Sequence, residues 1–573
     1  YVTTRTRQDV KIALPDNWEF SWHHVVANYD GSSIWLTVDG NESRRKPQSG
    51  NIRNTPFPVN IGRNAEIHGQ ETSVYISDAI IDQVGIFAKD ISARLLEEPT
   101  EGIKKQAGLW LDFEEEKPGG KYFSYGIGAR TYGSIWPDRR PQPEMWQIKK
   151  SAQPVHTKLA SPEKGLVEIA NRYLFTNLNE LEGRWALQEN GKILQQGKLD
   201  VNLEPGQKKL MEIPFAKPEI MPGAEYFLVI SFHLKEKKQW AEAGFETAWD
   251  QMRLPWFAPE KNNIIFKGGS VNAWENADKL IISGSSFIYS FSKSTGLLES
   301  VSAGGKELIK KGPVLNIWRA PLANETDSWT FWSSNIKNRI DGYGRMAATE
   351  WYSAGIDRLS FMNDHFSWEN QGDSCIVVSV RNVWSMAIQR GSFIDDSKYI
   401  IKDDGTIIYS NSIIPNGQMP AWLPRAGQQW ILDKSLGNVE WFGRGPQENY
   451  PDRKSGYRVG EYKSTAQEMY EPYLIPQDYG LRTDTRYVRI TDENGAGLEF
   501  RADRLFNFSL HPYSTENLKK AVYTYQLHPF DGMTFNLDYA TSGVGCTAAG
   551  VFPEYQVMPQ RYDCVVTIRP VLR

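Results

Sequence analysis

The sequence predicts an all-β protein assembled from several β-sandwiches. Short runs rich in β-branched and aromatic residues recur between turn residues along all 573 positions. Aromatic residues make up 12% of the chain, and 47 Gly and 31 Pro punctuate it. Closely spaced short strands separated by such turn residues are typical of sandwiches. Helical periodicity is scarce, and representative strand-like runs are residues 32–38, 226–234, 406–414 and 564–568.

Length and charge limit the number of domains and the kinds of partner that this chain can have. A chain of this size accommodates about three or four domains, because single cores stop growing near 250 to 300 residues. The formal net charge is −4, so no nucleic-acid or anionic-membrane partner is expected. The longest apolar runs are strand-sized, well short of the roughly 20 residues that span a bilayer. Cys375, Cys546 and Cys564 neither pair evenly nor follow a metal-ligand spacing.

Residues 259–573 contain a series of dense motifs. The most informative is Trp441-Phe-Gly-Arg-Gly-Pro-Gln-Glu-Asn-Tyr-Pro-Asp-Arg453. Others, in chain order around it, are Ile317-Trp-Arg-Ala-Pro-Leu-Ala-Asn-Glu-Thr-Asp327, Leu423-Pro-Arg-Ala-Gly427, Tyr473-Leu-Ile-Pro-Gln-Asp-Tyr-Gly-Leu-Arg482 and Asn536-Leu-Asp538. This set resembles the C-terminal domain of the large β-galactosidases of glycoside hydrolase family 2. The resemblance implies a large C-terminal β-supersandwich of the galactose-mutarotase-like type over residues 259–573.

Three further segments precede that domain. Residues 1–99, with Trp22-His-His-Val-Val-Ala-Asn-Tyr-Asp-Gly31, resemble the later half of a laminin-G or concanavalin-A-like module, a partial lectin-like sandwich that either binds sugar or acts as a spacer. Residues 100–150 are similar to the end of the family's catalytic barrel and its linker, where a Pro-punctuated turn precedes a helix. Residues 151–258 resemble the family's immunoglobulin-like sandwich, and Asn190-Gly191 predicts a hairpin within it.

The resemblance implies chemistry that these residues do not supply. The family places two catalytic glutamates on a (β/α)8 barrel, which needs about 250 residues of alternating strand and helix. No such alternation precedes Tyr132. The Asn-Glu pairs Asn41-Glu42, Asn179-Glu180 and Asn324-Glu325 lack the family's flanking residues. We therefore assign no catalytic residue here and expect part of a retaining β-galactosidase that is inactive alone, with a galactoside or other glycan as substrate and the N-terminal barrel portion of the same protein as partner.

The loop from Arg319 to Trp332 in the C-terminal domain is the predicted substrate-binding site. In the family its counterpart lies beside the barrel mouth, and aromatic faces, amides, carboxylates and a guanidinium suit a sugar ring and its hydroxyls. Phe552 joins the prediction because Gly550 stands where the family has a tryptophan. A structural loop with buried tryptophans is an equally weighted alternative. The predicted residues are Arg319, Asn324, Glu325, Asp327, Trp329, Trp332 and Phe552.

The motif that begins at Trp441 is interpreted as structural rather than ligand-binding. Gly443, Gly445 and Pro446 suit a tight turn. The charged side chains of the motif, Glu448, Asp452 and Arg453, are expected to pair locally or to satisfy buried backbone groups.

Two other functions remain open. One is a carbohydrate-binding assembly without chemistry, and the other is a mutarotase-like epimerase that would use His511 or His528. We expect no cofactor and no metal site within this chain, since the resemblance implies that the family's metal ions bind mainly at the barrel. The lectin-like segment favours a periplasmic or extracellular location, and the resemblance is compatible with a homo-oligomer.

Overall fold

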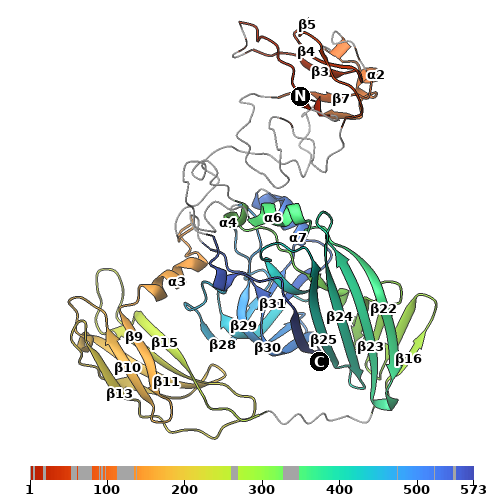
Figure 1. Ribbon diagram of the computed structural model, residues 1–573. Coiled ribbons are helices and arrows are strands. Elements are labelled where there is room, and N and C mark those ends of the chain that lie inside the picture. The colour runs from red at the N-terminus through yellow and green to blue at the C-terminus, as the bar shows by residue number, and fades with distance from the viewer. Residues whose placement is uncertain are drawn as a thin grey trace. The chain divides into compact units, whose positions relative to one another are not determined.

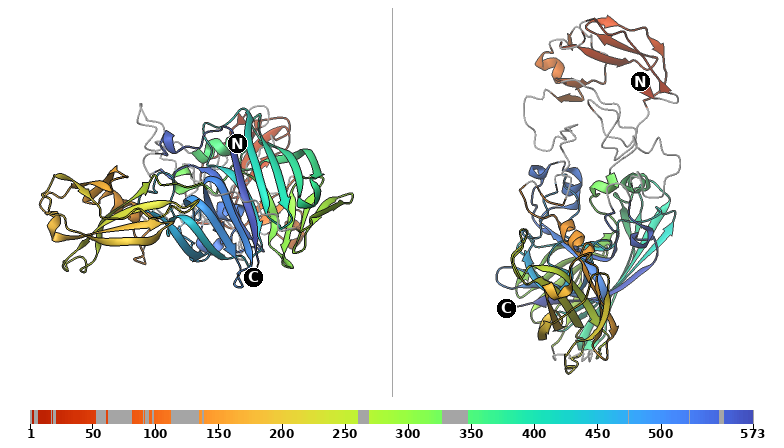
Figure 2. Two further views of the ribbon diagram at one scale, coloured as in Figure 1. Left: turned by 90° about the horizontal axis from the view of Figure 1, so that it is seen from below. Right: turned by 90° about the vertical axis from the view of Figure 1, so that its left-hand side faces the viewer.

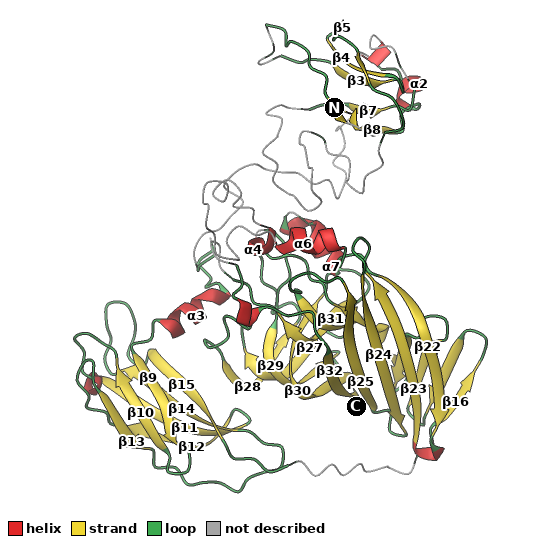
Figure 3. Cartoon of the chain, in the orientation of Figure 1, coloured by secondary structure: helices red, strands yellow, loops and turns green. Residues whose placement is uncertain are grey.

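The computed structural model forms two compact units, Tyr1–Gly120 and Lys121–Arg573 (Figure 1). Strands dominate both units, which confirms the all-β prediction (Figure 3). Across the described residues, no helix has the length and apolar character needed to cross a bilayer. The structure describes residues 2–3, 7–16, 18, 21–52, 61, 81–89, 91, 95–96, 99–111, 134–136, 138–259, 269–326, 347–473, 475–521, 523–545 and 550–572.

The first unit contains small antiparallel sheets. Strand β3 (Val25–Tyr29) pairs with β4 (Ser33–Val38), which also pairs with β5 (Asn41–Glu42) and β6 (Lys46–Pro47). The remaining elements are β1 (Val2–Thr3), β2 (Arg7–Gln8), β7 (Val84–Ile86), α2 (Glu101–Lys104) and β8 (Leu109–Leu111). Because β8 pairs with β7, the unit extends beyond the predicted 1–99 segment, whose lectin-like character stays a prediction.

The second unit begins with a helix and a two-sheet sandwich. Helix α3 (Pro143–Ser151) starts with proline at its first turn, where the missing N–H costs no hydrogen bond. One sheet has the order β13-β10-β9 and the other β12-β11-β14-β15. The strands are β9 (Val155–Ser161), β10 (Leu166–Asn171), β11 (Leu181–Glu189), β12 (Lys192–Leu199), β13 (Lys208–Glu212), β14 (Tyr226–Leu234) and β15 (Glu246–Leu254).

Local sequence signals in this sandwich are confirmed. Every residue of β14 is buried, as expected for a continuous apolar run between two neighbouring strands. Asn190 and Gly191 both have positive φ, 50° and 86°, and connect β11 to β12. Those backbone angles are the ones that Asn-Gly hairpin turns favour.

The large sandwich packs a five-stranded sheet against a twelve-stranded sheet (Figure 2). The smaller sheet runs β16 (Asn272–Glu275), β17 (Lys279–Ser283), β18 (Phe287–Ser292), β19 (Leu298–Ala303) and β20 (Lys306–Glu307). Its aromatic and aliphatic side chains share one buried core with the larger sheet. The larger sheet comprises β21 (Ile309–Asn316), β22 (Ser360–Asn370), β23 (Cys375–Ser385), β24 (Gly391–Lys402), β25 (Ile407–Gly417), β26 (Arg425–Leu432), β27 (Asn438–Gly445), β28 (Arg458–Thr465), β29 (Arg482–Thr491), β30 (Gly497–His511), β31 (Met533–Thr541) and β32 (Tyr562–Val571).

Short helices gather at one end of the large sandwich. They are α4 (Ala323–Thr326), α6 (Ala347–Ala354) and α7 (Thr515–Lys520) (Figure 3). Buried Trp351 of α6 belongs to a separate hydrophobic cluster beneath them. This end of the sandwich carries the loop that the sequence predicts to bind substrate.

One detail of the central motif differs from the prediction. Gly443 and Gly445 belong to strand β27, and the chain turns only after them. A Cβ at Gly443 would lie 2.9 Å from the Thr485 hydroxyl oxygen on the neighbouring strand β29. Close strand packing, rather than a tight turn, therefore explains glycine at this position.

Candidate functional site

A buried arginine organises the helical end of the large sandwich. Arg319 follows β21 and is fully buried. Its guanidinium donates to the Glu325 carboxylate of α4 at 2.5 and 3.4 Å and to the carbonyl oxygens of Ser542 and Gly543 at 3.1 and 3.0 Å. Burial opposes the charge, but the attraction of Glu325 outweighs it, so the pKa of Arg319 lies above its ordinary value. Arg319 thus ties α4 to the segment that follows β31.

Asp452, from the central motif, holds the same segment. Its carboxylate accepts hydrogen bonds from the backbone N–H groups of Val544 at 2.9 Å and Gly545 at 2.7 Å. Asn324 of α4 donates to the Val544 carbonyl oxygen at 2.9 Å. A Cβ at Gly543 would lie 2.4 Å from the Asp452 carboxylate, so glycine permits this approach. We call Arg319, Asn324, Glu325 and Asp452 together the α4 clamp.

A cavity of about 170 Å³ opens beside the α4 clamp. Its lining includes amide and carboxylate residues and a tryptophan, a combination that suits a ligand with both hydroxyls and an apolar side. The lining residues are Asn324, Glu325, Ala347, Glu350, Ala421, Trp422, Val544, Gly550, Val551, Pro553 and Gln556.

Trp422 is a cavity residue that the sequence analysis missed. Its ring lies 4.7 Å from that of Trp351 in an edge-to-face arrangement, and the Trp351 indole donates to its carbonyl oxygen at 2.9 Å. These contacts fix the position of the ring. The available signal was its place directly before the motif Leu423-Pro-Arg-Ala-Gly427.

The structure brings three of the predicted substrate-binding residues together. Asn324 and Glu325 line the cavity, whereas Arg319 lies beneath Glu325 without exposed surface. In this arrangement Arg319 and Glu325 position the loop, because their charged groups are turned to each other. Their direct contact with a substrate stays a prediction.

The remaining predicted residues are placed differently. Asp327, Trp329 and Trp332 lie outside the described residues. Phe552 is 61% exposed, and the residues on either side of it, Val551 and Pro553, line the cavity. Phe552 is therefore adjacent in sequence to two lining residues but is not itself one of them.

The central motif also holds α3, and its charged side chains pair locally as predicted. Glu448 is buried and accepts hydrogen bonds from Arg453, from the Tyr473 hydroxyl at 2.7 Å and from the Gly480 N–H at 2.6 Å. Arg453 also pairs with Glu144 of α3 at 2.6 Å. Burial raises the pKa of Glu448, although the Arg453 charge opposes that shift.

The two histidines considered for epimerase chemistry make local contacts. His511 is buried, its Nε2 lies 2.6 Å from the Tyr479 carbonyl oxygen, and its ring stacks on Tyr479. The backbone N–H of His528 donates to Asn517 on the exterior. Within the described ranges, no group of three or more His, Cys, Asp or Glu side chains is arranged to hold a metal ion.

Comparisons with known proteins find related sequences for two segments of this chain. The family described as "Beta galactosidase small chain" matches residues 283–568, and "Beta-galactosidase, domain 4" matches residues 167–255. The β-galactosidase of Priestia megaterium is 27% identical over 450 residues, which cover 77% of this chain and 41% of that protein. The β-galactosidase of Vibrio cholerae serotype O1 is 28% identical over 479 residues, which cover 80% of this chain and 44% of that protein.

Solved structures with some likeness include the galactose 1-epimerase of Lactobacillus acidophilus, with a TM-score of 0.25 and 8% identity over 52% of this chain and 98% of that one. A GalM/aldose epimerase homologue from C. elegans gives a TM-score of 0.26 and 10% identity, with the same coverage of both chains.

Together, the consecutive sandwiches and the two matching family descriptions indicate a glycosidase-related region. The chain belongs to the β-galactosidase family and corresponds to a C-terminal portion of such an enzyme. It spans less than half the length of the curated relatives described above.

Proposed function

We propose that this chain is the C-terminal region of a retaining β-galactosidase of glycoside hydrolase family 2. It lines one wall of the sugar site and leaves the catalytic carboxylates to a barrel elsewhere in the longer polypeptide, which we call the parent. The names of the relatives and their greater length support a hydrolase parent. The observation that carries the proposed role is the α4 clamp beside an open cavity, which Asn324 of the clamp lines together with Trp422.

The buried glutamates of this site are unsuited to catalysis. Retaining hydrolysis requires two carboxyl groups about 5 to 5.5 Å apart, one acting as acid and base and the other as nucleophile. Glu325 is engaged by Arg319, and Glu448 by Arg453, and both glutamates are buried. A carboxylate held in such a pair is neither a ready proton donor nor an accessible nucleophile. These residues are better suited to positioning loops.

Covalent trapping in the parent tests this proposal. A 2-deoxy-2-fluoro-β-galactoside with a good leaving group should accumulate as a glycosyl-enzyme on the nucleophile of a retaining enzyme. Peptide mapping should then place the label on a carboxylate outside these 573 residues. A label on any Asp or Glu within them would refute the proposed division of roles. Neither labelling nor turnover in the parent would instead support a carbohydrate-binding assembly without chemistry.

A further inference from the structure

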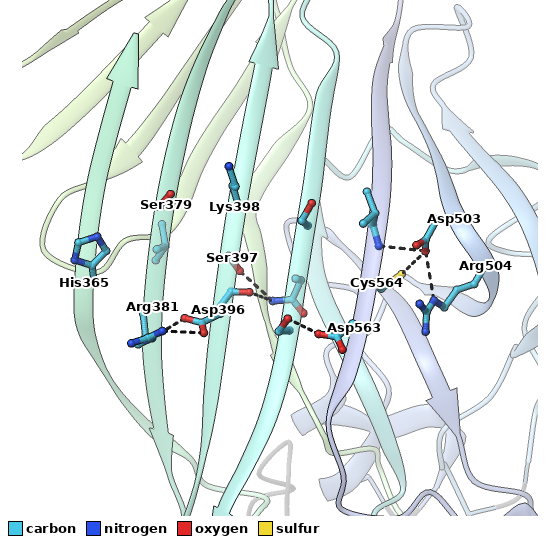
Figure 4. A pocket seen from close by; sticks show the side chains of 15 residues that line it. His365, Ser379, Arg381, Asp396, Ser397, Lys398, Asp503, Arg504, Asp563 and Cys564 are labelled. Atoms are coloured by element: carbon cyan, nitrogen blue, oxygen red, sulfur yellow. Dashed lines mark hydrogen bonds and ion pairs between the residues drawn. The ribbon is translucent and has the colours of Figure 1, made fainter. Parts of the chain in front are cut away.

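The outer face of the large sheet carries a polar groove of about 600 Å³ (Figure 4). Alternation along the strands determines which side chains reach it. In β23, Ile376, Val378 and Val380 are buried in the sandwich core, whereas Ser379 and Arg381 point to the opposite face. The groove shares no lining residue with the cavity beside the α4 clamp.

Strand register arranges the groove residues in two rows that cross five strands. One row runs through β22, β23, β24, β25 and β32 as His365, Arg381, Asp396, Ser412 and Asp563. Because neighbouring strands lie about 4.8 Å apart, such a row is roughly 19 Å long. The adjacent row follows the same strands as Ser367, Ser379, Lys398, Ser410 and Val565, of which Ser367 is not one of the groove-lining residues.

Contacts within the first row hold its carboxylates in place. Arg381 donates to both oxygens of Asp396 at 2.6 and 3.1 Å. Asp563 accepts hydrogen bonds from Ser412 and from Arg561, the latter at 2.9 Å to each oxygen. A carboxylate offers about four lone-pair sites, so these bonds leave acceptors for a ligand. The side chains of Arg381 and Asp396 remain 49% and 33% exposed, which makes them reachable.

The second row adds donors. Lys398 is exposed, and within the part of the chain that the structure describes its ammonium makes no ion pair. Ser379 and Ser410 occupy the positions directly across from it on the two neighbouring strands. Each hydroxyl can both donate and accept. A ligand along the groove would meet alternating donors and acceptors on a surface held rigid by the sheet.

We propose that this groove binds a neutral oligosaccharide. Its lining contains three cations, Arg381, Lys398 and Arg504, and three carboxylates, Asp396, Asp503 and Asp563. The three positive and three negative charges cancel, with His365 left out of the balance. The groove therefore has no excess positive charge with which to select an anion. Its volume lies within the range of about 300 to 1,000 Å³ found for small-molecule sites. The length of the rows favours a short chain of sugars over a monosaccharide.

Calorimetric titration of the purified 573-residue chain tests this inference. The probes are galactose, lactose and a β-1,4-linked galactotetraose, with inorganic phosphate as the anionic comparison. We expect the tetrasaccharide to bind most tightly and phosphate not to bind. Lys398→Ala should weaken tetrasaccharide binding about tenfold, as expected for one charge-assisted hydrogen bond. Ser379→Trp should abolish binding by filling the groove.

Lys434→Ala provides the matched control, because that side chain is 68% exposed and lies outside the groove lining. It should leave the Kd unchanged, and thermal melting of each variant verifies folding. The inference would be overturned if no saccharide bound or if phosphate bound in preference. It would also be overturned if Lys398→Ala and Ser379→Trp bound the tetrasaccharide as tightly as the unchanged chain. The chain is titrated alone, so the result is independent of whether the parent hydrolyses galactosides.

Discussion

At the scale of single residues, buried arginine–carboxylate pairs organise the helical end of the large sandwich. Arg319 pairs with Glu325, and Arg425 with Asp478 at 2.6 Å, all with side chains at most 3% exposed. Removing both charges from water is costly, but losing one partner costs more, because the other is left buried without compensation. These pairs therefore specify loop positions more than they add net stability.

Replacing one member of the Arg319 pair should be strongly destabilising. Arg319→Met leaves Glu325 buried and uncompensated, and we expect a loss of about 3 to 5 kcal/mol in the free energy of unfolding by chemical denaturation. The double variant Arg319→Met/Glu325→Leu should recover part of that loss. Arg184→Met removes an exposed pair with Glu182 and should leave the melting temperature unchanged. Equal destabilisation by the single and double variants would contradict this account.

Glu471 should make stability depend on pH. Burial, reinforced by the Glu448 charge, raises the pKa of Glu471 from 4.5 to about 8. The folded state therefore binds this proton more tightly than the unfolded state, so the associated stability is present below pH 4.5 and is lost as the pH rises through about 8. Because glutamine does not ionise, Glu471→Gln should not lose this stability as the pH rises.

Melting temperatures between pH 5 and pH 9 test this prediction. The melting temperature of Glu471→Gln should equal that of the unchanged chain near pH 5 and exceed it by at least about 2 °C near pH 9. Glu493→Gln is the control, because Glu493 is exposed in a turn. If the melting temperatures of Glu471→Gln and of the unchanged chain depend on pH in the same way, the prediction is wrong.

At the scale of elements, α3 is fastened to the large sandwich by polar contacts. Gln147 accepts from the Gly456 N–H at 2.9 Å and donates to the Ser455 hydroxyl at 2.8 Å. The Tyr457 hydroxyl donates to the Pro143 carbonyl oxygen. A Cβ at Gly456 would lie 2.8 Å from the Trp146 carbonyl oxygen, which leaves no space for a larger residue.

Gly456→Ala should therefore displace α3. Overpacking of this kind costs about 1 to 3 kcal/mol, and hydrogen exchange of the amides in residues 147–151 should become faster. Gly437→Ala is the comparison, since the nearest atom to its Cβ would be 3.9 Å away. Unchanged protection of α3 in Gly456→Ala would show that the contact is dispensable.

Local elements were predictable because their signals are local. The Asn190-Gly191 hairpin and the buried strand β14 follow from backbone preference and hydrophobic pattern. The α4 clamp does not, because Arg319 meets Gly543 across 224 positions. No periodicity encodes such a pairing, so the site residues were predictable only through the family resemblance.

At the scale of the whole molecule, the smaller and larger sandwiches of the second unit share an interface. The side-chain amide of Gln251 donates to the Val459 carbonyl oxygen at 2.8 Å, and its oxygen accepts from the Val459 N–H at 2.7 Å. Phe227 and Phe442 pack beside them, and Arg486 pairs with Glu225 at 2.5 Å. These contacts join the two sandwiches of the second unit to each other.

We propose that these sandwiches belong to a β-galactosidase whose catalytic carboxylates lie outside the 573 residues. Release of nitrophenol from p-nitrophenyl β-galactoside, measured for the purified chain and for the parent, tests it most directly. We predict turnover by the parent and none above the buffer rate by the 573-residue chain. Turnover by the chain alone, or none by an intact and folded parent, would contradict this assignment of the catalytic carboxylates.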